Sequence, residues 1–257
     1  MAEKFELTNE SIIHKGNKLH RIRALKSFGR IKEGDLGGFV QSENNLSDKG
    51  DAWIYHDAKV YDDAIVSGNA SVLNNAEIFE SSYIYGDAII GKNAKTYGSA
   101  AITGSAFVGG NAEVYGCADI YDSTKILNNA RICGRVCIEG DCRIKDNAKV
   151  CGDAHISGCT IYGDALIDGK VYIDSSDAYF GSNAIISSEK DFVAINILTS
   201  ESQRYTFYKN NNIYYVSVYD EEYLLDDFMK FIKNEYGELS IDYLILKNLE
   251  NIVKMKI

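Results

Sequence analysis

Histidine and cysteine are the side chains of this chain best suited to catalysis, and both are few. The 257 residues include four histidines and six cysteines. A histidine can act as a general base on a hydroxyl or an amine when its partner lies within hydrogen-bond reach. His56 and His155 are the candidates for such a base, because His14 and His20 flank a predicted hairpin turn that leaves their imidazoles on opposite faces. The cysteines show no CxxC pair and no metal-type spacing, so neither a metal site nor a cofactor is expected.

Basic residues in the second half of the chain form the other candidate site. The chain is acidic, with a net charge of −10 and a pI near 4.9, so general nucleic-acid binding is not expected. A local group of cations could still bind a small anion. The alternative is that these charges are solvated and balance nearby acids. The five anion-binding candidates are Lys125, Arg131, Arg143, Lys145 and Lys149.

The five cations, His56 and His155 all lie within a strict six-residue repeat. It runs from Asp51 to Gly158 in eighteen copies, with no inserted or missing residue. The second position is Ala in fourteen copies, and the fourth is Ile or Val in seventeen. Positions two and four of an extended strand share one face. Positions six and one are mostly Gly, Asn or Asp, which tolerate the bent backbone of a corner. Each copy therefore predicts a short strand followed by a corner.

Strands this short cannot bury an apolar face alone, so successive copies must stack on one another. The repeat resembles that of hexapeptide-repeat proteins, in which three hexads form one coil of a left-handed parallel β-helix. Only the resemblance implies the left-handed sense, because ordinary parallel crossovers are right-handed. The expected fold is mainly β, a left-handed parallel β-helix in which the eighteen hexads form six full coils.

Counting by eighteen then predicts which residues are neighbours. His56 would lie on the first strict coil and His155 on the sixth, about 24 Å apart, so they cannot act together. Cys133 and Cys151 would lie one above the other on adjacent coils. Reduced thiols are the expectation for a cytosolic protein, and a disulfide between these two cysteines is the alternative.

Three domains are predicted. Residues 1–32 would form a basic hairpin cap, with Gly16–Asn17 as its two-residue turn. Residues 33–188 would form the β-helix, and its first coil would place Leu36, Val40 and Leu46 inward. Residues 189–257 would form an α+β domain that covers the open strand edges of the last coil. That domain is expected to contain strands at 192–198, 204–209 and 213–218 and helices at 221–236 and 240–254.

Nearly the whole chain resembles the YdcK-type family, hexapeptide-repeat proteins of bacteria and phages that are often labelled transferases. The resemblance rests on residues 19–54 (LHRIRALKSFGRIKEGDLGGFVQSENNLSDKGDAWI), the alanine-rich hexads, and the tail elements DFV (Asp191), YTFYK (Tyr205), YVS (Tyr215) and LDDF (Leu225). Relatives tend to carry SCGCF after the third strand and a Thr-His-Gly-Asp-like turn between the helices. This chain has SVYDE and NEYGE there, so roles that depend on those thiols or that histidine are not expected.

Side chains that point outward form columns at intervals of eighteen residues. Aromatic residues are enriched at subunit interfaces, and a continuous apolar strip on an acidic rod favours a buried contact. Paired glycines at 91 and 109 would let another backbone approach. Hexapeptide β-helices are typically trimers, so one of two columns is predicted to contact another subunit of a homotrimer. The first column is Tyr61, Phe79, Tyr97 and Tyr115, and the second is Trp53, Ile89 and Phe107 beside Leu73 and Leu127.

Three functions remain open. The first is a non-catalytic trimeric rod that binds a partner, and because relatives occur in phages, this could be a host protein or a nucleotide-type ligand that it sequesters. The second is an acyltransferase with His56 or His155 as its base, although the uninterrupted repeat leaves no loop to cover an acyl donor. The third is a structural assembly module. The sequence shows no signal-peptide pattern and no long apolar run, so a cytoplasmic protein without membrane contact is expected.

Overall fold

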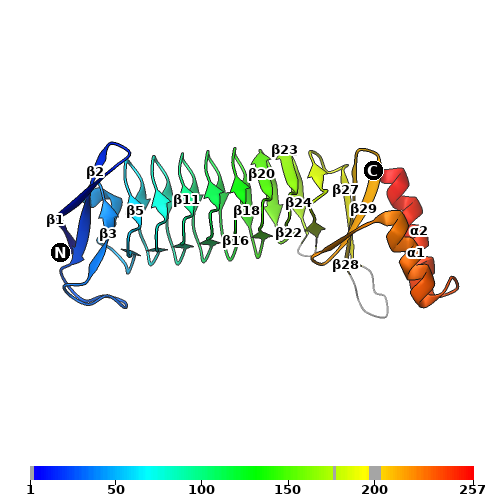
Figure 1. Cartoon of the computed structure of the whole chain (residues 1–257), viewed down its shortest axis with the longest axis horizontal. Coiled ribbons are helices and arrows are strands. Elements are labelled where there is room, and N and C mark those ends of the chain that lie inside the picture. Colours follow the sequence, from blue (N-terminus) through cyan, green and yellow to red (C-terminus); the bar gives the residue numbers. More distant parts are fainter. Residues whose placement is uncertain (1–2, 176–177, 197–203) are drawn as a thin grey trace.

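The chain folds into a parallel β-solenoid with a β-hairpin at one end and a small α+β unit at the other (Figure 1). The computed structural model describes residues 3–175, 178–196 and 204–257. Very short strands stack into three parallel sheets, which form the three sides of a coil with about eight turns. The predicted fold, a parallel β-helix with three hexads per coil and an α+β end, is confirmed.

The three sheets are named here face 1, face 2 and face 3. Face 1 contains β4 (Trp53–Ile54), β7 (Ser71–Val72), β10 (Ile89–Ile90), β13 (Phe107–Val108), β16 (Lys125–Ile126), β19 (Arg143–Ile144), β22 (Thr160–Ile161) and β25 (Tyr179–Phe180). Face 2 contains β3 (Leu36–Val40), β5 (Lys59–Val60), β8 (Glu77–Ile78), β11 (Lys95–Thr96), β14 (Glu113–Val114), β17 (Arg131–Ile132), β20 (Lys149–Gly152), β23 (Leu166–Gly169) and β26 (Ile185–Ile186). Face 3 contains β6 (Ile65–Val66), β9 (Tyr83–Ile84), β12 (Ala101–Ile102), β15 (Asp119–Ile120), β18 (Cys137–Glu139), β21 (His155–Ser157) and β24 (Tyr172–Asp174).

The composition of the repeat explains this stacking. Neighbouring coils within the strict repeat pair residues eighteen apart, as in β5 and β8, where Lys59 lies opposite Glu77 and Val60 opposite Ile78. The Ala and Ile or Val positions point inward and are completely buried. The corners need a left-handed backbone at positions where coils touch. At Gly134, with φ of 87°, an added Cβ would lie 2.3 Å from the carbonyl oxygen of Gly152, so only glycine fits there.

The N-terminal hairpin consists of β1 (Phe5–His14) and β2 (Asn17–Ala24), and β2 pairs antiparallel with β3 of face 2. Its two-residue turn is Lys15–Gly16, one residue earlier than predicted, because His14 pairs with Asn17. This register still leaves His14 and His20 on opposite faces of the hairpin, since Ser11 is the partner of His20.

The first coil differs from its predicted register. Val40 aligns with the buried Val60, and Leu46 forms a bridge with Val66, so both point inward as expected. Leu36 was predicted to point inward too, but it is 58% exposed. The reason is that Val40 takes the branched inward position, so the small inward position falls on Gly38 and not on a residue of the preceding hexad. An added Cβ at Gly38 would lie 2.5 Å from the carbonyl oxygen of Ala58. A 3₁₀ turn, η1 (Glu43–Asn45), follows this strand.

The C-terminal unit contains one more strand than predicted. Its antiparallel sheet consists of β27 (Phe192–Asn196), β28 (Arg204–Asn210), β29 (Ile213–Val218) and β30 (Glu221–Leu224). The helices are α1 (Leu225–Tyr236) and α2 (Ile241–Lys256). Residues 221–224 were predicted to begin the first helix, but they pair with β29 instead. Residues 197 and 198, predicted as the end of a strand, lie outside the described residues.

A buried polar network joins this unit to the last coils. The hydroxyl of Tyr208 hydrogen-bonds Glu222 and lies 2.9 Å from Oγ of Ser217, and the Gly181 amide donates to it at 3.2 Å. Burial raises the pKa of the Tyr208 hydroxyl far above its usual value, so it stays protonated.

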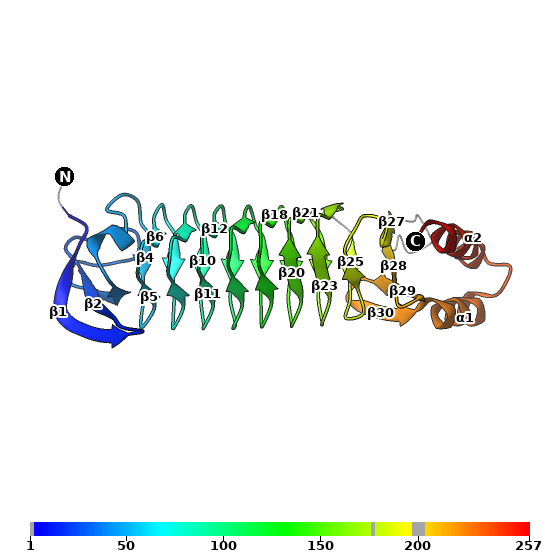
Figure 2. The same cartoon turned by 90° about the horizontal axis from the view of Figure 1, so that it is seen from above.

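The hairpin and the helix pair lie at opposite ends of an elongated molecule (Figure 2). None of the helices in the described part of the chain is long and apolar enough to cross a membrane.

Candidate functional site

The two histidines proposed as catalytic bases lie far apart and already have other roles. His56 is exposed at a corner with φ of 54°, and its Nδ1 accepts a hydrogen bond from the Asn74 amide at 3.3 Å. His155 lies in β21 of face 3, with Nε2 3.3 Å from a carboxylate oxygen of Glu139 and its ring stacked 5.0 Å from that of Tyr172. The structure therefore does not bring the two imidazoles together, and His56 caps a backbone amide.

A cysteine lies next to His155, a placement that sequence reasoning missed. Cys137 is the strand partner of His155, and Glu139 follows on the same strand. A catalytic cysteine needs a lowered pKa that favours the thiolate. Here burial raises the pKa of the Cys137 thiol, and the nearby carboxylates of Glu139 and Asp119 raise it further. This cluster is therefore poorly suited to nucleophilic chemistry.

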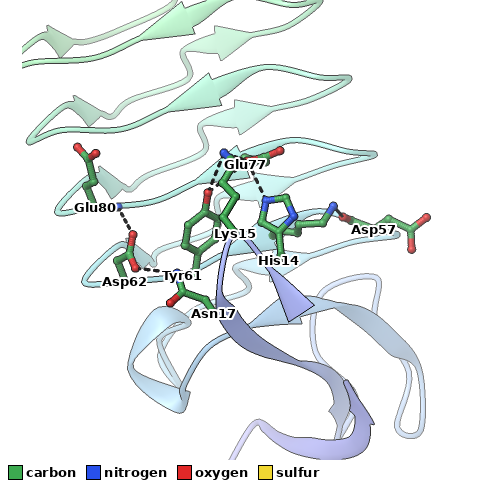
Figure 3. A network of polar contacts seen from close by, with 9 residues as sticks. His14, Lys15, Asn17, Asp57, Tyr61, Asp62, Glu77 and Glu80 are labelled. Atoms are coloured by element: carbon green, nitrogen blue, oxygen red, sulfur yellow. Dashed lines mark hydrogen bonds and ion pairs between the residues drawn. The ribbon is translucent and has the colours of Figure 1, made fainter. Parts of the chain in front are cut away.

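The tip of the N-terminal hairpin is fixed to the solenoid by four side chains, called here the hairpin clasp: His14, Lys15, Tyr61 and Glu77 (Figure 3). Nζ of Lys15 lies 2.8 Å from Oε2 of Glu77 and donates to the Tyr61 hydroxyl at 3.2 Å. The Tyr61 hydroxyl donates to the same Glu77 oxygen at 3.2 Å, and Nε2 of His14 lies 3.2 Å from it. Glu77 thus receives three partners from two distant segments of the chain.

The protonation states of the clasp residues suit a role in stabilising the fold, and they do not suit catalysis. Burial alone would raise the pKa of Glu77, but the hydrogen bonds from Lys15 and His14 outweigh it and hold that pKa at about 2. Burial raises the pKa of Tyr61 to about 12, despite the hydrogen bond from Lys15. Burial would lower the pKa of Lys15, but its hydrogen bonds to Glu77 and Tyr61 raise it. Tyr61 and Lys15 therefore hold their protons at neutral pH, and neither can serve as a base.

Replacing Glu77 by Gln is expected to destabilise the N-terminal end by about 2 kcal/mol at pH 7, a figure reduced for the half-exposed Lys15. Because the folded pKa of Glu77 is about 2 and its ordinary value is 4.5, its contribution is complete above about pH 5 and is lost as the pH falls toward 2. Urea unfolding of wild type and Glu77→Gln should therefore differ at pH 7 and converge near about pH 2.

Glu113→Gln is the matched control, because Glu113 occupies the same position two coils later and its one ion pair among the described residues is with Arg131, at 3.7 Å. It should change the free energy of unfolding by less than about 0.5 kcal/mol. An equal loss in both variants, or a Glu77→Gln loss that persists in acid, contradicts the role given to the clasp.

The predicted aromatic column exists as a stack of rings. Tyr61, Phe79, Tyr97 and Tyr115 have successive ring centroids 5.1, 4.9 and 4.9 Å apart, with nearly parallel planes. The hairpin covers its first members: Tyr61 is 2% exposed, and Nζ of Lys15 lies 4.7 Å from the Phe79 ring centroid. Tyr61 therefore offers no surface to a second subunit, whereas Tyr97 and Tyr115 are partly exposed and their role at an interface stays a prediction.

Cys133 and Cys151 continue this column and are joined by a disulfide. Their Cα atoms are 4.7 Å apart, because they occupy the same position on adjacent coils. The expectation of reduced thiols is therefore wrong for this pair. Cys117, Cys137, Cys142 and Cys159 are free thiols.

The second predicted column, on face 1, is also partly covered by the chain itself. Trp53 is 1% exposed, because the ring of Phe28 packs edge-on against it at 5.5 Å. Gly109, predicted to admit another backbone, instead makes room for the ring of Phe107, which an added Cβ would approach to 2.6 Å. The rest of this column remains at the surface: Leu73, Ile89, Phe107 and Leu127, with Ile89 the most exposed.

Face 3 carries an apolar surface that sequence reasoning overlooked. Ile65, Tyr83, Tyr85 and Tyr121 are all exposed, and the rings of Tyr83 and Tyr85 lie 5.9 Å apart. Counting every eighteenth residue on the third face would have found these residues, because they occupy the same outward positions as the columns on faces 1 and 2.

Four of the five anion-binding candidates form two stacks of like charge, called here the basic stacks. Lys125 lies directly opposite Arg143 on face 1, and Arg131 lies directly opposite Lys149 on face 2. Arg131 has an ion pair with Glu113 at 3.7 Å. Among the described residues, the other three cations have no ion-pair partner.

Lys145 does not belong to the stacks. Its Nζ lies 2.8 Å from Asp220 of the C-terminal unit and 5.6 Å from the ring centroid of Tyr162. The candidate set of five cations is thus divided: four define the basic stacks, and Lys145 helps to hold the C-terminal unit against the solenoid.

A polar groove, called here the amide groove, lies along the corner between faces 1 and 2. Its volume is about 550 Å³. Asparagine side chains form a ladder along it, in which Nδ2 of Asn93 donates to Asn111 at 3.1 Å and Nδ2 of Asn111 donates to Asn129 at 3.0 Å. The basic stacks lie on the two faces that meet at this corner. The groove is lined by Lys92, Asn93, Gly110, Asn111, Asn128, Asn129, Asp146 and Asn147.

No protein-family model and no curated protein matches this chain. In the part of the chain that the structure describes, no group of three or more His, Cys, Asp or Glu side chains could hold a metal ion. The amide groove and the basic stacks on the two adjoining faces are the candidate site for an anion.

Proposed function

We propose that this protein is a non-catalytic binding protein that forms a homotrimer and holds a phosphate-bearing, nucleotide-type ligand in the amide groove. The observation that carries the proposal is the pair of basic stacks on the two faces that meet at the groove. A sequestering role of this kind agrees with the resemblance to the YdcK-type proteins of bacteria and phages.

The charge pattern of face 2 supports a ligand at this point of the rod. In the earlier coils the outward position alternates in sign through Lys59, Glu77, Lys95 and Glu113, so that opposite charges face each other. The alternation stops at Arg131 and Lys149. Like charges directly opposite each other on neighbouring strands are destabilising. A bound anion would remove that repulsion.

The groove also has a suitable size and chemistry. Small-molecule sites commonly have volumes between about 300 and 1,000 Å³, and the groove falls in this range. Phosphate oxygens accept hydrogen bonds from amides and from lysine or arginine side chains, and such charge-assisted bonds are strong. The carboxylate of Asp146 already accepts from Nδ2 of Asn128 at 2.9 Å and from the Gly163 amide at 3.2 Å.

Calorimetric titration with a panel of nucleotides, cyclic oligonucleotides and coenzyme A tests the proposal. We expect saturable binding of at least one phosphate-bearing compound, with the compound recovered unchanged. Turnover of acetyl-CoA, abolished by His56→Ala or His155→Ala, would instead support the acyltransferase alternative. A panel without any binding would support a purely structural assembly module.

The trimer is proposed to form through the exposed apolar part of face 1. Ile89→Glu should convert the trimer to single chains, because it places a charge within the column of Leu73, Phe107 and Leu127. Mass measurement by light scattering checks this result. Tyr85→Glu on face 3 is the control and should leave the mass unchanged; the reverse outcome would assign the interface to face 3.

A further inference from the structure

Helix α2 has an apolar face that no other segment covers in the part of the chain that the structure describes. Its inner side buries Leu246, Glu250 and Val253 against the rest of the C-terminal unit. On its outer side, Ile241 is 75% exposed and Met255 is 80% exposed. The outer residues, called here the α2 stripe, are Ile241, Leu244, Asn248, Asn251, Ile252 and Met255, all of which are exposed.

The spacing of the α2 stripe is that of a helix-pairing surface. Ile241, Leu244, Asn248, Asn251 and Met255 follow steps of three and four residues, the pattern that aligns side chains along one side of a helix. At 100° per residue the stripe covers roughly a 100° arc, opposite the inner side of the helix. An amphipathic helix with one buried side has no internal need for this second apolar surface.

We infer that two copies of the chain associate tail to tail through α2, with the two helices antiparallel about a two-fold axis beside Asn248. Helix α2 runs from Ile241 to Lys256, so Asn248 lies at its midpoint. In such a pair the two Asn248 side chains would meet at the axis, where amides can hydrogen-bond each other. Ile241 and Leu244 of one chain would meet Met255 and Ile252 of the other, which is an isologous contact.

The polar residues in and beside the α2 stripe favour a second copy of the chain, and not a lipid surface, as the partner of the stripe. A buried asparagine within an apolar helix seam specifies register and partner, whereas a membrane offers it no hydrogen bond. The chain carries a net charge of −10, which opposes attraction to anionic lipids. The flanking lysines Lys247 and Lys254 have ion pairs with Glu250 and Asp226 of their own chain, so they repel a second copy only weakly.

The position and size of the surface agree with this assembly. The helix pair lies at the end of the rod opposite the hairpin, so tail-to-tail contact does not obstruct the solenoid (Figures 1 and 2). The exposed fractions of the four apolar residues correspond to roughly 500 Å² per chain, which is the size of the largest apolar patch on a typical monomer and less than a standard interface. We therefore expect the α2 pair to be weak and to depend on protein concentration.

Sedimentation over a range of protein concentrations tests the association. The full chain with Ile89→Glu, which removes the proposed trimer, should shift from one copy to two as its concentration rises. Adding Ile241→Glu should weaken this step at least about 30-fold. The control is Ile13→Glu, since Ile13 is 74% exposed, nearly the same as Ile241, but lies in the hairpin at the other end. It should leave the association unchanged.

Cross-linking tests the antiparallel arrangement. Under mild oxidation Asn248→Cys should form a disulfide with its own copy, identified by mass spectrometry of the linked peptides. Ile241→Cys should link to a chain carrying Met255→Cys and not to itself. In a parallel pair each residue would meet its own copy, so self-linkage at 241 would indicate parallel helices and overturn the proposal whatever the result at 248.

Two further results would also overturn it. One is a mass that does not depend on Ile241→Glu at any concentration. The other is binding to phosphatidylglycerol vesicles that Ile241→Glu abolishes while the mass stays constant. Both are independent of ligand binding in the amide groove, so the proposed function can fail or hold separately.

Discussion

Replacing Ala112 by Leu is expected to destabilise the solenoid by about 3 kcal/mol or more, one of the largest effects of any single substitution in this chain. Ala112 is completely buried, and the preceding and following coils place Ala94 and Ala130 in the same inward position. Three extra carbon atoms at this point can fit only if neighbouring strands separate.

Separation of those strands breaks the ladder that holds the coils together. The Lys95 amide donates to the carbonyl of Ala112 at 2.9 Å, and the Glu113 amide donates to the carbonyl of Ala130 at 3.0 Å. Buried amides that lose their partners cost about 1–3 kcal/mol each, so strain and lost hydrogen bonds act in the same direction. The midpoint of urea unfolding, followed by circular dichroism, measures the effect.

Ala101→Leu is the matched control. Ala101 lies in a strand of the same length on face 3, but it points outward between Tyr83 and Asp119. Its side chain is partly exposed, so the larger residue should change the free energy of unfolding by less than about 0.5 kcal/mol. If Ala112→Leu were as stable as this control, the interior would have room to spare, and the small inward position would need another explanation.

Most of the solenoid could be predicted from the sequence because each repeat by itself specifies a short strand and a corner. The same small and branched positions recur every six residues, so the stacking and the columns follow from counting. The aromatic stack from Tyr61 to Tyr115 and the adjacency of Cys133 and Cys151 were both obtained in this way. The redox state of Cys133 and Cys151 could not be predicted in this way, because adjacency alone does not decide whether two thiols are oxidised.

The six-residue repeat could not predict contacts between segments that are distant in the sequence. Nothing local to Lys15 or Phe28 indicates that the first covers Phe79 and the second covers Trp53. The strand at 221–224 was missed for a similar reason, because its pairing with β29 is a tertiary effect that overrides a helix-like local sequence. The anion-binding role of the basic residues stays a prediction, and only the structure separates Lys145, bound to Asp220, from the stacks.

Removing one cation from each basic stack is expected to reduce ligand affinity about 100-fold. Lys125→Gln and Lys149→Gln together take away one positive charge on each side of the amide groove. Each charge-assisted hydrogen bond contributes about 1.5–3 kcal/mol, and two such losses correspond to about two orders of magnitude. Titration of the double variant with the nucleotide found for wild type measures the change. Lys59→Gln with Lys95→Gln is the control, because these residues occupy the same outward position of face 2 in earlier coils and face glutamates instead of cations.

The same double variant should be slightly more stable than wild type without ligand, by a few tenths of a kcal/mol. Each substitution removes repulsion from Arg143 or Arg131 on the neighbouring strand, and among the described residues neither lysine has an ion pair to lose. The control variant should move the other way, since it removes attraction to Glu77 and Glu113. A gain in stability with a loss of affinity is expected when residues serve a ligand at the expense of the fold. If affinity stays constant, or if the double variant loses stability, the basic stacks are solvated surface charges and the amide groove is not the ligand site.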